Sequence, residues 1–404
     1  MAIGTLIGWL DPEFAAKLRP LSTMFLRMIK MIVTPILFTT LVMGIAGHGD
    51  DMKRIGRLAA KSLAYFWFMT FIALAIGLIA VHITKPGIGV LIPPPDPGTP
   101  LPTPAPRTLI GFIEHIVPTS IIDAAARNEV LQVVFWSTLF GISLAQVKGR
   151  GKESVLAVVE GLMEAMFKFV AIVMKFAPIG IGAAIAVTVS HSGIEVLKNL
   201  GLLVLTLYAA LIVFALVALL PVALLARVPL KRFIQHVKDP AIIAFTTTSS
   251  DAALPMAMQR MINFGVPKRI VAFVMPTGYS FNLDGSTLYL GVASIFVAQA
   301  AGVHLSFGQI IAMMLTLLIT SKGIAAVPRA SLVVLAGVLT TYGLPVQGIA
   351  VILGVDELMD MARTMVNLVG NCLACAIMGR WEGELDDRVL RGEIPAPDAV
   401  EQIA

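Results

Sequence analysis

Six polar residues in an apolar segment near the C-terminus have the types and the spacing of a buried binding site. Within residues 345–371 they recur at helical intervals, as Asp356, Asp360, Arg363, Thr364, Asn367 and Asn371. At about 100° per residue, all six lie on one helix face within an arc of about 100°. Each ionised group at the centre of a bilayer costs at least about 2.5 kcal/mol. We therefore expect this face to line a path for a substrate or an ion, the alternative being polar contacts between packed helices.

The composition predicts a protein that crosses a membrane several times. Of its 404 residues 57% are hydrophobic and only 14% are charged, whereas a soluble domain carries about 25% charged residues. The net charge of +5 does not indicate a nucleic-acid partner, because the basic residues are scattered over short loops. The positive-inside rule explains them better, with membrane lipid as the surroundings. Cys372 and Cys375 lie in an apolar run, so we expect packing rather than a redox or zinc site.

Long apolar segments, which we expect to be helices, alternate with two kinds of loop. The segments cover residues 21–47, 58–83, 130–147, 155–190 and 196–226. Basic loops at residues 53–57, 148–152 and 227–231 alternate with a Pro-rich linker at 85–107 and a nearly uncharged loop at 191–193. Basic loops remain in the cytoplasm, so we expect the Pro-rich linker outside and the C-terminus in the cytoplasm.

Two later segments are predicted to be re-entrant hairpins. In the first, a Ser/Thr-rich tip at residues 246–251 separates two short apolar stretches, and basic loops flank the pair on both sides. In the second, a tip at residues 321–328 separates residues 307–320 from 330–341, and the flanks lack basic residues. The two hairpins therefore enter from opposite sides. This inverted repeat is the sequence pattern of a transporter whose site lies near the bilayer midplane.

Between the hairpins, residues 270–301 form an apolar span that polar residues interrupt. Residues 282–285 read Asn-Leu-Asp-Gly in the middle of this span. Unwinding there would free backbone carbonyls which, with Asn282 and Asp284 oxygens, suit a hard cation such as sodium. The alternative is a Gly-caused kink whose polar residues bond to each other.

Four motifs resemble those of the dicarboxylate/amino acid:cation symporter family, and are most similar to its bacterial proton/sodium–glutamate members. They lie at residues 247–255, 276–286, 323–328 and 356–367, and the resemblance runs from about Leu21 to Glu384. It implies an all-α polytopic membrane fold with eight transmembrane helices, two re-entrant hairpins, inverted repeats and a homotrimer. Residues 1–10 are too short to cross about 30 Å, so we expect a truncated first helix.

The resemblance also divides the chain into parts, with a mobile transport domain that moves against a trimerisation scaffold. Residues 1–57 are implied to be scaffold, and residues 58–107 helix 3 with the extracellular linker. The remaining parts are helices 4–6 (108–228, with 4 and 5 in the scaffold and 6 in the transport domain), hairpin 1 (229–266), helix 7 (267–302), hairpin 2 or outer gate (303–344), helix 8 (345–385) and a cytoplasmic tail (386–404).

The family pattern implies a substrate role for eight residues. Arg363 would hold the substrate's side-chain carboxylate through a bidentate fork. Asp360 would pair with the substrate ammonium, and Asn367 would hydrogen-bond its α-carboxylate. Further contacts are implied for Thr364, Ser286, Ser249, Ser250 and Val327.

The same resemblance implies cation and gate positions, with Na⁺ or H⁺ as coupling ions and no other cofactor. The implied cation positions are Gly278, Ser280, Asn282, Asp284, Asn367, Asn371, Thr70, Ser321 and Ile324. Gly323 and Pro328 would belong to the outer gate, where Ala326 and Arg329 replace glycines of many relatives and would stiffen it.

Three departures from the family pattern concern the coupling ion. Asn371 stands where sodium-coupled relatives have an Asp, and Phe66, Met69 and Thr70 replace a fuller set of Tyr and Thr/Ser ligands. Leu290 stands where animal members have a proton-carrying Glu. We therefore expect a proton gradient to drive transport at least partly. Carboxylates would carry the proton, with Asp251 and Asp356 as candidates, although Asp251 could instead cap a helix.

Together with these residues, the resemblance implies a secondary active symporter that imports aspartate or glutamate by elevator-type alternating access, in the plasma membrane of a bacterium. The alternative is a C4-dicarboxylate symporter. Asp360 makes this less favoured, because its carboxylate would repel a substrate that lacks an ammonium. Buried Asp residues could also serve an intramembrane enzyme. The spans offer no His-containing metal motif or Ser/His pair, so we expect no enzyme.

Overall fold

The computed structural model describes residues 2–46, 52–92, 117–127, 129–193, 195–324, 330–385 and 387–395. Throughout these ranges the regular elements are helices, which confirms the predicted all-α class.

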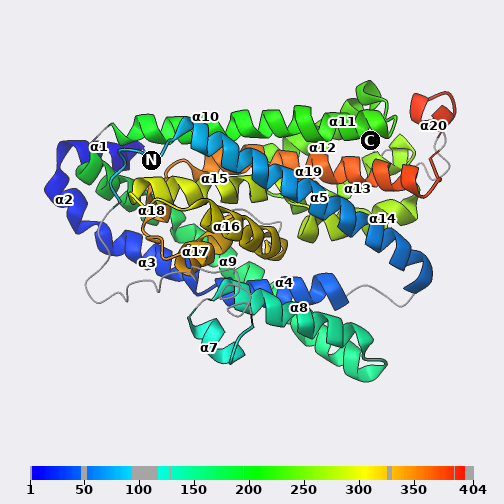
Figure 1. Cartoon of the computed structure of the whole chain (residues 1–404), viewed down its shortest axis with the longest axis horizontal. Coiled ribbons are helices and arrows are strands. Elements are labelled where there is room, and N and C mark those ends of the chain that lie inside the picture. The colour runs from blue at the N-terminus through cyan, green and yellow to red at the C-terminus, as the bar shows by residue number, and fades with distance from the viewer. Residues whose placement is uncertain are drawn as a thin grey trace.

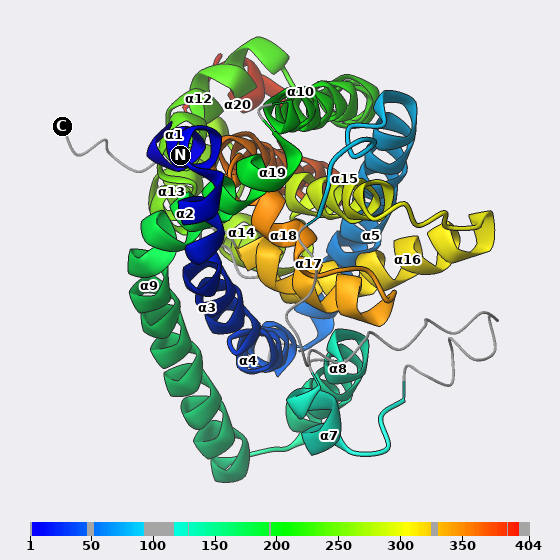
Figure 2. The same cartoon turned by 90° about the vertical axis from the view of Figure 1, so that its left-hand side faces the viewer.

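Most helices of the first half of the chain pack with one another. They are α1 (Ala2–Leu10), α2 (Pro12–Lys17), α3 (Arg19–Lys30), α4 (Val33–Ala46), α7 (Ile121–Ala126), α8 (Val130–Gln146) and α9 (Arg150–Ser192). The long helix α9 contacts α1 to α4, and α8 packs along α4. Figure 2 shows α3, α4 and α9 side by side, with α7 and α8 next to them.

The remaining helices form a second group. They are α5 (Met52–Thr84), α10 (Val196–Phe214), the π-helical turn η1 (Ala215–Leu219), α11 (Leu220–Leu225), α12 (Leu230–Thr247), α13 (Ser250–Phe264), α14 (Lys268–Phe281), α15 (Asp284–Ala300), α16 (Phe307–Thr320), the 3₁₀ turn η2 (Ser321–Gly323), α17 (Ala330–Thr341), α18 (Gly348–Ile352), α19 (Asp356–Trp381) and α20 (Asp387–Arg391). In Figure 1, α10, α15 and α19 lie along the long axis.

Helix α15 is the centre of this second group. Its residues from Asp284 to Ala298 are all buried, and it contacts α5, α10, α16, α17 and α19. A helix that is buried on all sides must be apolar all round or have its polar groups paired inside the protein. The paired groups lie at its N-terminal end, where the candidate site is built.

Two apolar segments that were predicted as single helices are interrupted, each close to a proline. Residues 21–47 form α3 and α4, because the ring of Pro35 clashes with the carbonyl four residues earlier and the helix breaks at residues 31–32. Residues 196–226 contain η1, which ends two residues before Pro221. Because a proline has no N–H for the ordinary i→i−4 hydrogen bond, the helix forms a wider, π-helical turn near it.

Other predicted boundaries agree with the structure. The break within residues 270–301 lies at Asn282 and Leu283, between α14 and α15. The two arms of the second hairpin are α16 and α17, over the predicted ranges, and α12 and α13 are the arms of the first. Residues 93–116 of the linker and following segment, residues 325–329 of the second tip and residues 396–404 of the tail lie outside the described residues.

Four helical stretches in the described part of the chain are long and apolar enough to cross a membrane. They are Arg57–Thr84, Val196–Leu225, Lys268–Ala300 and Asp356–Trp381. Shorter apolar helices include Phe307–Thr320 and Ser331–Thr341. A protein with several such helices fits the predicted membrane class, while eight spans and the re-entrant course of the hairpins stay predictions.

Candidate functional site

The polar face of α19 is buried against protein. All six residues of the face are at most 6% exposed, and Asp356, Arg363 and Asn371 are fully buried. Helix α19 contacts α14 and α15, and also α12 and α13. The stripe faces the broken pair α14–α15, since Asn367 bonds to Gly285 and Ser286 and Asn371 bonds to Asn282.

Arg363 lies between two carboxylates on its own helix. Its Nε donates to Asp360 Oδ1 at 2.8 Å, and its Nη1 donates to Asp356 Oδ1 at 3.1 Å. Thr364 Oγ1 also donates to Asp360 Oδ1, at 3.0 Å. The guanidinium lies 4.0 Å from the centre of the Tyr289 ring of α15, which is within cation–π range. Two ion pairs and an aromatic ring thus hold this side chain in place.

Two atoms of this cluster remain without a partner among the described residues. They are Arg363 Nη2 and Asp356 Oδ2, and both are buried. A buried donor of a charged group is costly to leave unsatisfied, so Nη2 is a ready contact for an anionic ligand. A bidentate fork to a substrate carboxylate needs two N–H groups; a guanidinium has five, and the two ion pairs use one on Nε and one on Nη1.

Asn367 joins α19 to the broken end of α15. Its Oδ1 accepts from the backbone N–H groups of Gly285 and Ser286, at 2.8 and 3.2 Å, and its Nδ2 donates to Ser286 Oγ at 2.9 Å. The first N–H groups of a helix have no partner within the helix, so the amide acts as a cap supplied by another helix. A Cβ on Gly285 would lie 2.5 Å from the Arg363 carbonyl oxygen, which explains the glycine at this crossing.

Asn282 and Asn371 form a second polar cluster. Asn282 Nδ2 donates to Asn371 Oδ1 at 3.1 Å. A Cβ on Gly278 would lie only 2.1 Å from that same oxygen, so the close approach requires glycine. Within the described residues, Asn282 Oδ1, Asp284 Oδ2 and Asn371 Nδ2 are buried without a hydrogen-bond partner. Amide and carboxylate oxygens are the ligands that hard cations prefer, and the free oxygens fit such an ion.

The other cation positions lie near this cluster or at the tip of the second hairpin. Thr70 Oγ1 lies 3.0 Å from Asp284 Oδ1. Ser280 is half-buried near the end of α14. Ser321 and Ile324 are buried, and the Ile324 N–H donates to the Ser321 carbonyl across η2, which includes Gly323. Val327 and Pro328 lie outside the described residues, as do Ala326 and Arg329. No group of three or more His, Cys, Asp or Glu suited to a metal occurs in the described ranges.

The tip of the first hairpin is held by its own turn and by α14. Thr248 adopts a left-handed conformation with φ of 52°, and Ser249 is the N-cap of α13, accepting from the Ala252 N–H at 3.4 Å. Tyr279 donates from its hydroxyl to the buried Ser250 carbonyl at 3.0 Å. Ser249 is the N-cap of α13, whereas the side chain of Asp251 lies outside what the structure describes, so both roles of Asp251 stay predictions.

Lys322, at the tip of the second hairpin, is a site residue that the sequence prediction missed. Its Nζ donates to Thr70 Oγ1 at 2.6 Å and to the Phe281 carbonyl at 2.7 Å, and the residue is 4% exposed. Tyr289, which stacks on Arg363, was missed as well. A lysine within an apolar tip is itself a signal, because a charge at that depth needs partners inside the protein.

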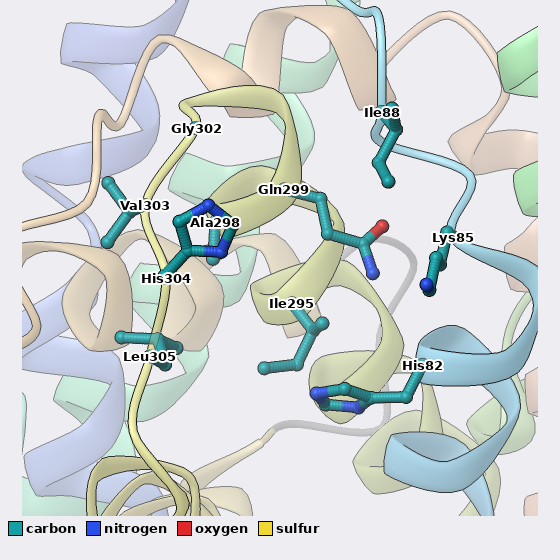
Figure 3. Close-up of a pocket in the computed structure, with 10 residues that line it drawn as sticks. All are labelled: His82, Lys85, Ile88, Ile295, Ala298, Gln299, Gly302, Val303, His304 and Leu305. Atoms are coloured by element: carbon teal, nitrogen blue, oxygen red, sulfur yellow. The ribbon is translucent and has the colours of Figure 1, made fainter.

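A cavity of about 280 Å³ opens at the other end of α5 and α15, away from the polar face of α19. Figure 3 shows His82 and Lys85 on one side of it and His304 on the other, with Gln299 between them. Gln299 accepts from the Gly87 N–H and donates to the Val81 carbonyl, so it fastens the loop after α5. No predicted site residue among the described ones lines this cavity.

Cys372 and Cys375 are fully buried free thiols in α19, in agreement with packing.

The chain belongs to the sodium:dicarboxylate symporter family, whose sequence profile matches residues 1–381. Members of this family are membrane transporters, so the protein is a transporter and not an enzyme. This confirms the family that its motifs predict.

Several relatives match nearly the whole chain. It is 42% identical to a proton/sodium-glutamate symport protein of Geobacillus stearothermophilus, over 96% of the chain and 94% of that protein. It is 42% identical to a proton/glutamate-aspartate symporter of Bacillus subtilis, over 95% and 93%. It is 40% identical to a C4-dicarboxylate transport protein of Anaeromyxobacter, over 98% and 92%. The chain is therefore a symporter of glutamate or dicarboxylates with a cation, and both substrate classes occur among its relatives.

Proposed function

We propose that this symporter imports acidic amino acids, aspartate or glutamate, and that Arg363 binds the substrate's side-chain carboxylate. The observation that carries the proposal is the buried Nη2 of Arg363, which has no hydrogen-bond partner among the described residues. A carboxylate placed there would supply a charge-assisted hydrogen bond. The position is close to Thr364 and to the α15 end that carries Ser286, which are further proposed contacts.

The charges around Arg363 favour an amino acid over a C4-dicarboxylate. Asp356 and Asp360 share one guanidinium, so the cluster has one excess negative charge when both carboxylates are ionised. A further negative charge about 5 Å away costs about 3 kcal/mol at an effective dielectric constant of about 20. An amino acid brings an ammonium that offsets this repulsion, and Asp360 is its proposed partner. A C4-dicarboxylate brings two negative charges and none of opposite sign.

A C4-dicarboxylate remains the second candidate, because relatives of that description are 40% identical to the chain. Asp360 already accepts hydrogen bonds from Arg363 and Thr364. A carboxylate so neutralised repels a second anion less than a free one would. The two substrate classes therefore differ in whether the Asp360 carboxylate pairs with an ammonium of the bound substrate.

We further propose an elevator in a homotrimer, with α1 to α4, α8 and α9 as scaffold and the helices around α15 as the transport part. The division is supported by packing, since the scaffold helices contact α9 or α4, whereas α12, α13, α14 and α15 each contact α19. Helices α16 and α17 contact α3 and α8 as well as α15, which suits a gate at the border of two parts. The proposed coupling ions are protons or sodium at the Asn282 and Asp284 end of α15.

Uptake into proteoliposomes tests the substrate assignment. Purified protein in liposomes should accumulate labelled aspartate above empty liposomes, and unlabelled glutamate should compete more strongly than succinate. Competition by succinate that matches or exceeds that by glutamate would favour the C4-dicarboxylate candidate. Absence of aspartate uptake, with succinate uptake intact, would overturn the proposal.

A further inference from the structure

The Lys322 ammonium contacts two oxygen atoms and lies near an aromatic ring. It donates to Thr70 Oγ1 at 2.6 Å and to the Phe281 carbonyl at 2.7 Å, and the Trp67 ring centre is 5.8 Å away. The residue is 4% exposed, although it stands in a turn between two apolar helices. Burying an ammonium is unfavourable unless hydrogen bonds and opposite charge replace its water, so this position is specifically built to hold a cation.

The groups around the ammonium are those that would bind a hard metal cation. Thr70 supplies a hydroxyl, and Phe281 supplies a carbonyl that α14 leaves free because the helix stops before Asn282. Asp284 supplies the negative charge through Thr70, whose Oγ1 is 3.0 Å from Asp284 Oδ1. Hydroxyl, carbonyl and carboxylate oxygens are common ligands of such ions. The set includes Thr70 and Asp284, the two residues of the family's cation pattern that the sequence places on α5 and α15.

A sodium ion and the ammonium cannot share this place. At a separation of about 4 Å and an effective dielectric constant of about 20, their repulsion would weaken sodium binding about a thousandfold. The residues at this position therefore do not fit the expected sodium site, because the Lys322 side chain occupies it.

We propose that Lys322 is a tethered cation, whose ammonium replaces one coupling ion among Thr70, the Phe281 carbonyl and Asp284 when the second hairpin is docked. The inference rests on the proposed symport function and narrows its cation requirement. The turn η2 contacts α14 and α4, and Lys322 connects it to α5. When the tip of the second hairpin docks, the Lys322 ammonium therefore fills this cation site at the same time. No free ion is needed there.

The test is the thermal stability of the purified protein in sodium chloride and in choline chloride at equal ionic strength, without substrate. In Lys322→Met the site loses its resident charge while the side-chain length is retained, and sodium should occupy it. The rise in Tm from choline to sodium should exceed that of the wild type by about 3 °C, which is the shift for sodium at about 100 times its Kd. Lys198→Met is the control, because Lys198 is an exposed residue paired with Glu195, and it should keep the wild-type response.

A second variant covers the case in which Lys322→Met does not fold. Adding Asp284→Asn removes the unpaired charge, so the double variant should fold, recover Tm in choline and lose the extra sodium response. The proposal is overturned if Lys322→Met folds and keeps the wild-type sodium response, or if neither variant folds. It is supported if the double variant folds and Lys322→Met does not. Since the readout needs no transport, loss of aspartate uptake would bear on the proposed function and not on Lys322.

Discussion

Replacing Arg363 by alanine should damage both the fold and the function, which the sequence alone does not indicate. The sequence predicts that this guanidinium serves the substrate, so that its removal would leave the protein folded. In the structure, however, Arg363 is fully buried and pairs with Asp356 and Asp360. Its loss leaves two buried carboxylates without a counter-charge.

The size of the effect follows from that geometry. Removing one partner of a buried ion pair costs about 3–5 kcal/mol, and the stacking on Tyr289 adds to the loss. For a chain of 404 residues, with an unfolding entropy of about 2.1 cal/mol/K per residue, the corresponding fall in Tm is roughly 4–6 °C. Arg363→Ala should therefore show this fall in a thermal unfolding assay, together with loss of aspartate uptake.

Matched variants separate charge from packing. Arg363→Ala combined with Asp360→Asn leaves one unpaired carboxylate instead of two, and should recover part of the Tm without recovering uptake. Arg127→Ala removes an exposed partner of Asp123 and should change Tm by less than about 2 °C, because exposed ion pairs contribute little. If Arg363→Ala keeps a Tm within about 2 °C of the wild type, the ion-pair cluster does not stabilise the fold as described. If it also keeps wild-type aspartate affinity, the substrate role is wrong.

Three further changes have defined outcomes. Asp360→Ser should weaken aspartate binding much more than succinate binding, because only aspartate loses an ammonium partner; equal losses in a competition assay would contradict that role. Gly278→Ala should lower Tm and uptake, because its Cβ would lie 2.1 Å from Asn371 Oδ1, whereas Gly161→Ala, which meets open space, should do neither. Outside the spans, hydrogen bonds from Lys61 and Arg57 lower the pKa of Glu382, so its folded-state pKa lies below the unfolded one. The stabilisation is present above the unfolded pKa and is lost as the pH falls through the folded pKa. Glu382→Gln should therefore lower Tm at neutral pH, with a difference that shrinks on acidification; a difference that persists unchanged in acid would count against the pairing.

Periodicity and local chemistry were enough to predict much of the fold. The spacing from Asp356 to Asn371 predicted a single buried face on α19, since a polar residue every third or fourth position can only be paired on one side. The Asn-Leu-Asp-Gly sequence predicted the break between α14 and α15. In contrast, the interruptions near Pro35 and Pro221 were hidden within long apolar runs, where composition alone indicates one helix.

Contacts between distant parts of the chain could not be predicted in this way. Lys322 bonds to Thr70, which is 252 positions earlier, and no local pattern pairs the two. The substrate role of Asn367 stays a prediction, and its cap on α15 through Gly285 and Ser286 is a contact that no local pattern indicates. In both cases the decisive information is the direction in which a side chain points after three helices have packed together.

The most direct test of cation-coupled transport is uptake of labelled aspartate into proteoliposomes under separately imposed proton and sodium gradients. Asn371 cannot ionise, and Asp284 is already linked through Thr70 to the Lys322 ammonium, so fewer anionic ligands remain for sodium than in a site with an additional Asp. We predict that an inward proton gradient drives uptake at least partly, with an incomplete dependence on sodium. Uptake that requires sodium strictly and is unchanged when the pH gradient is collapsed would contradict this prediction.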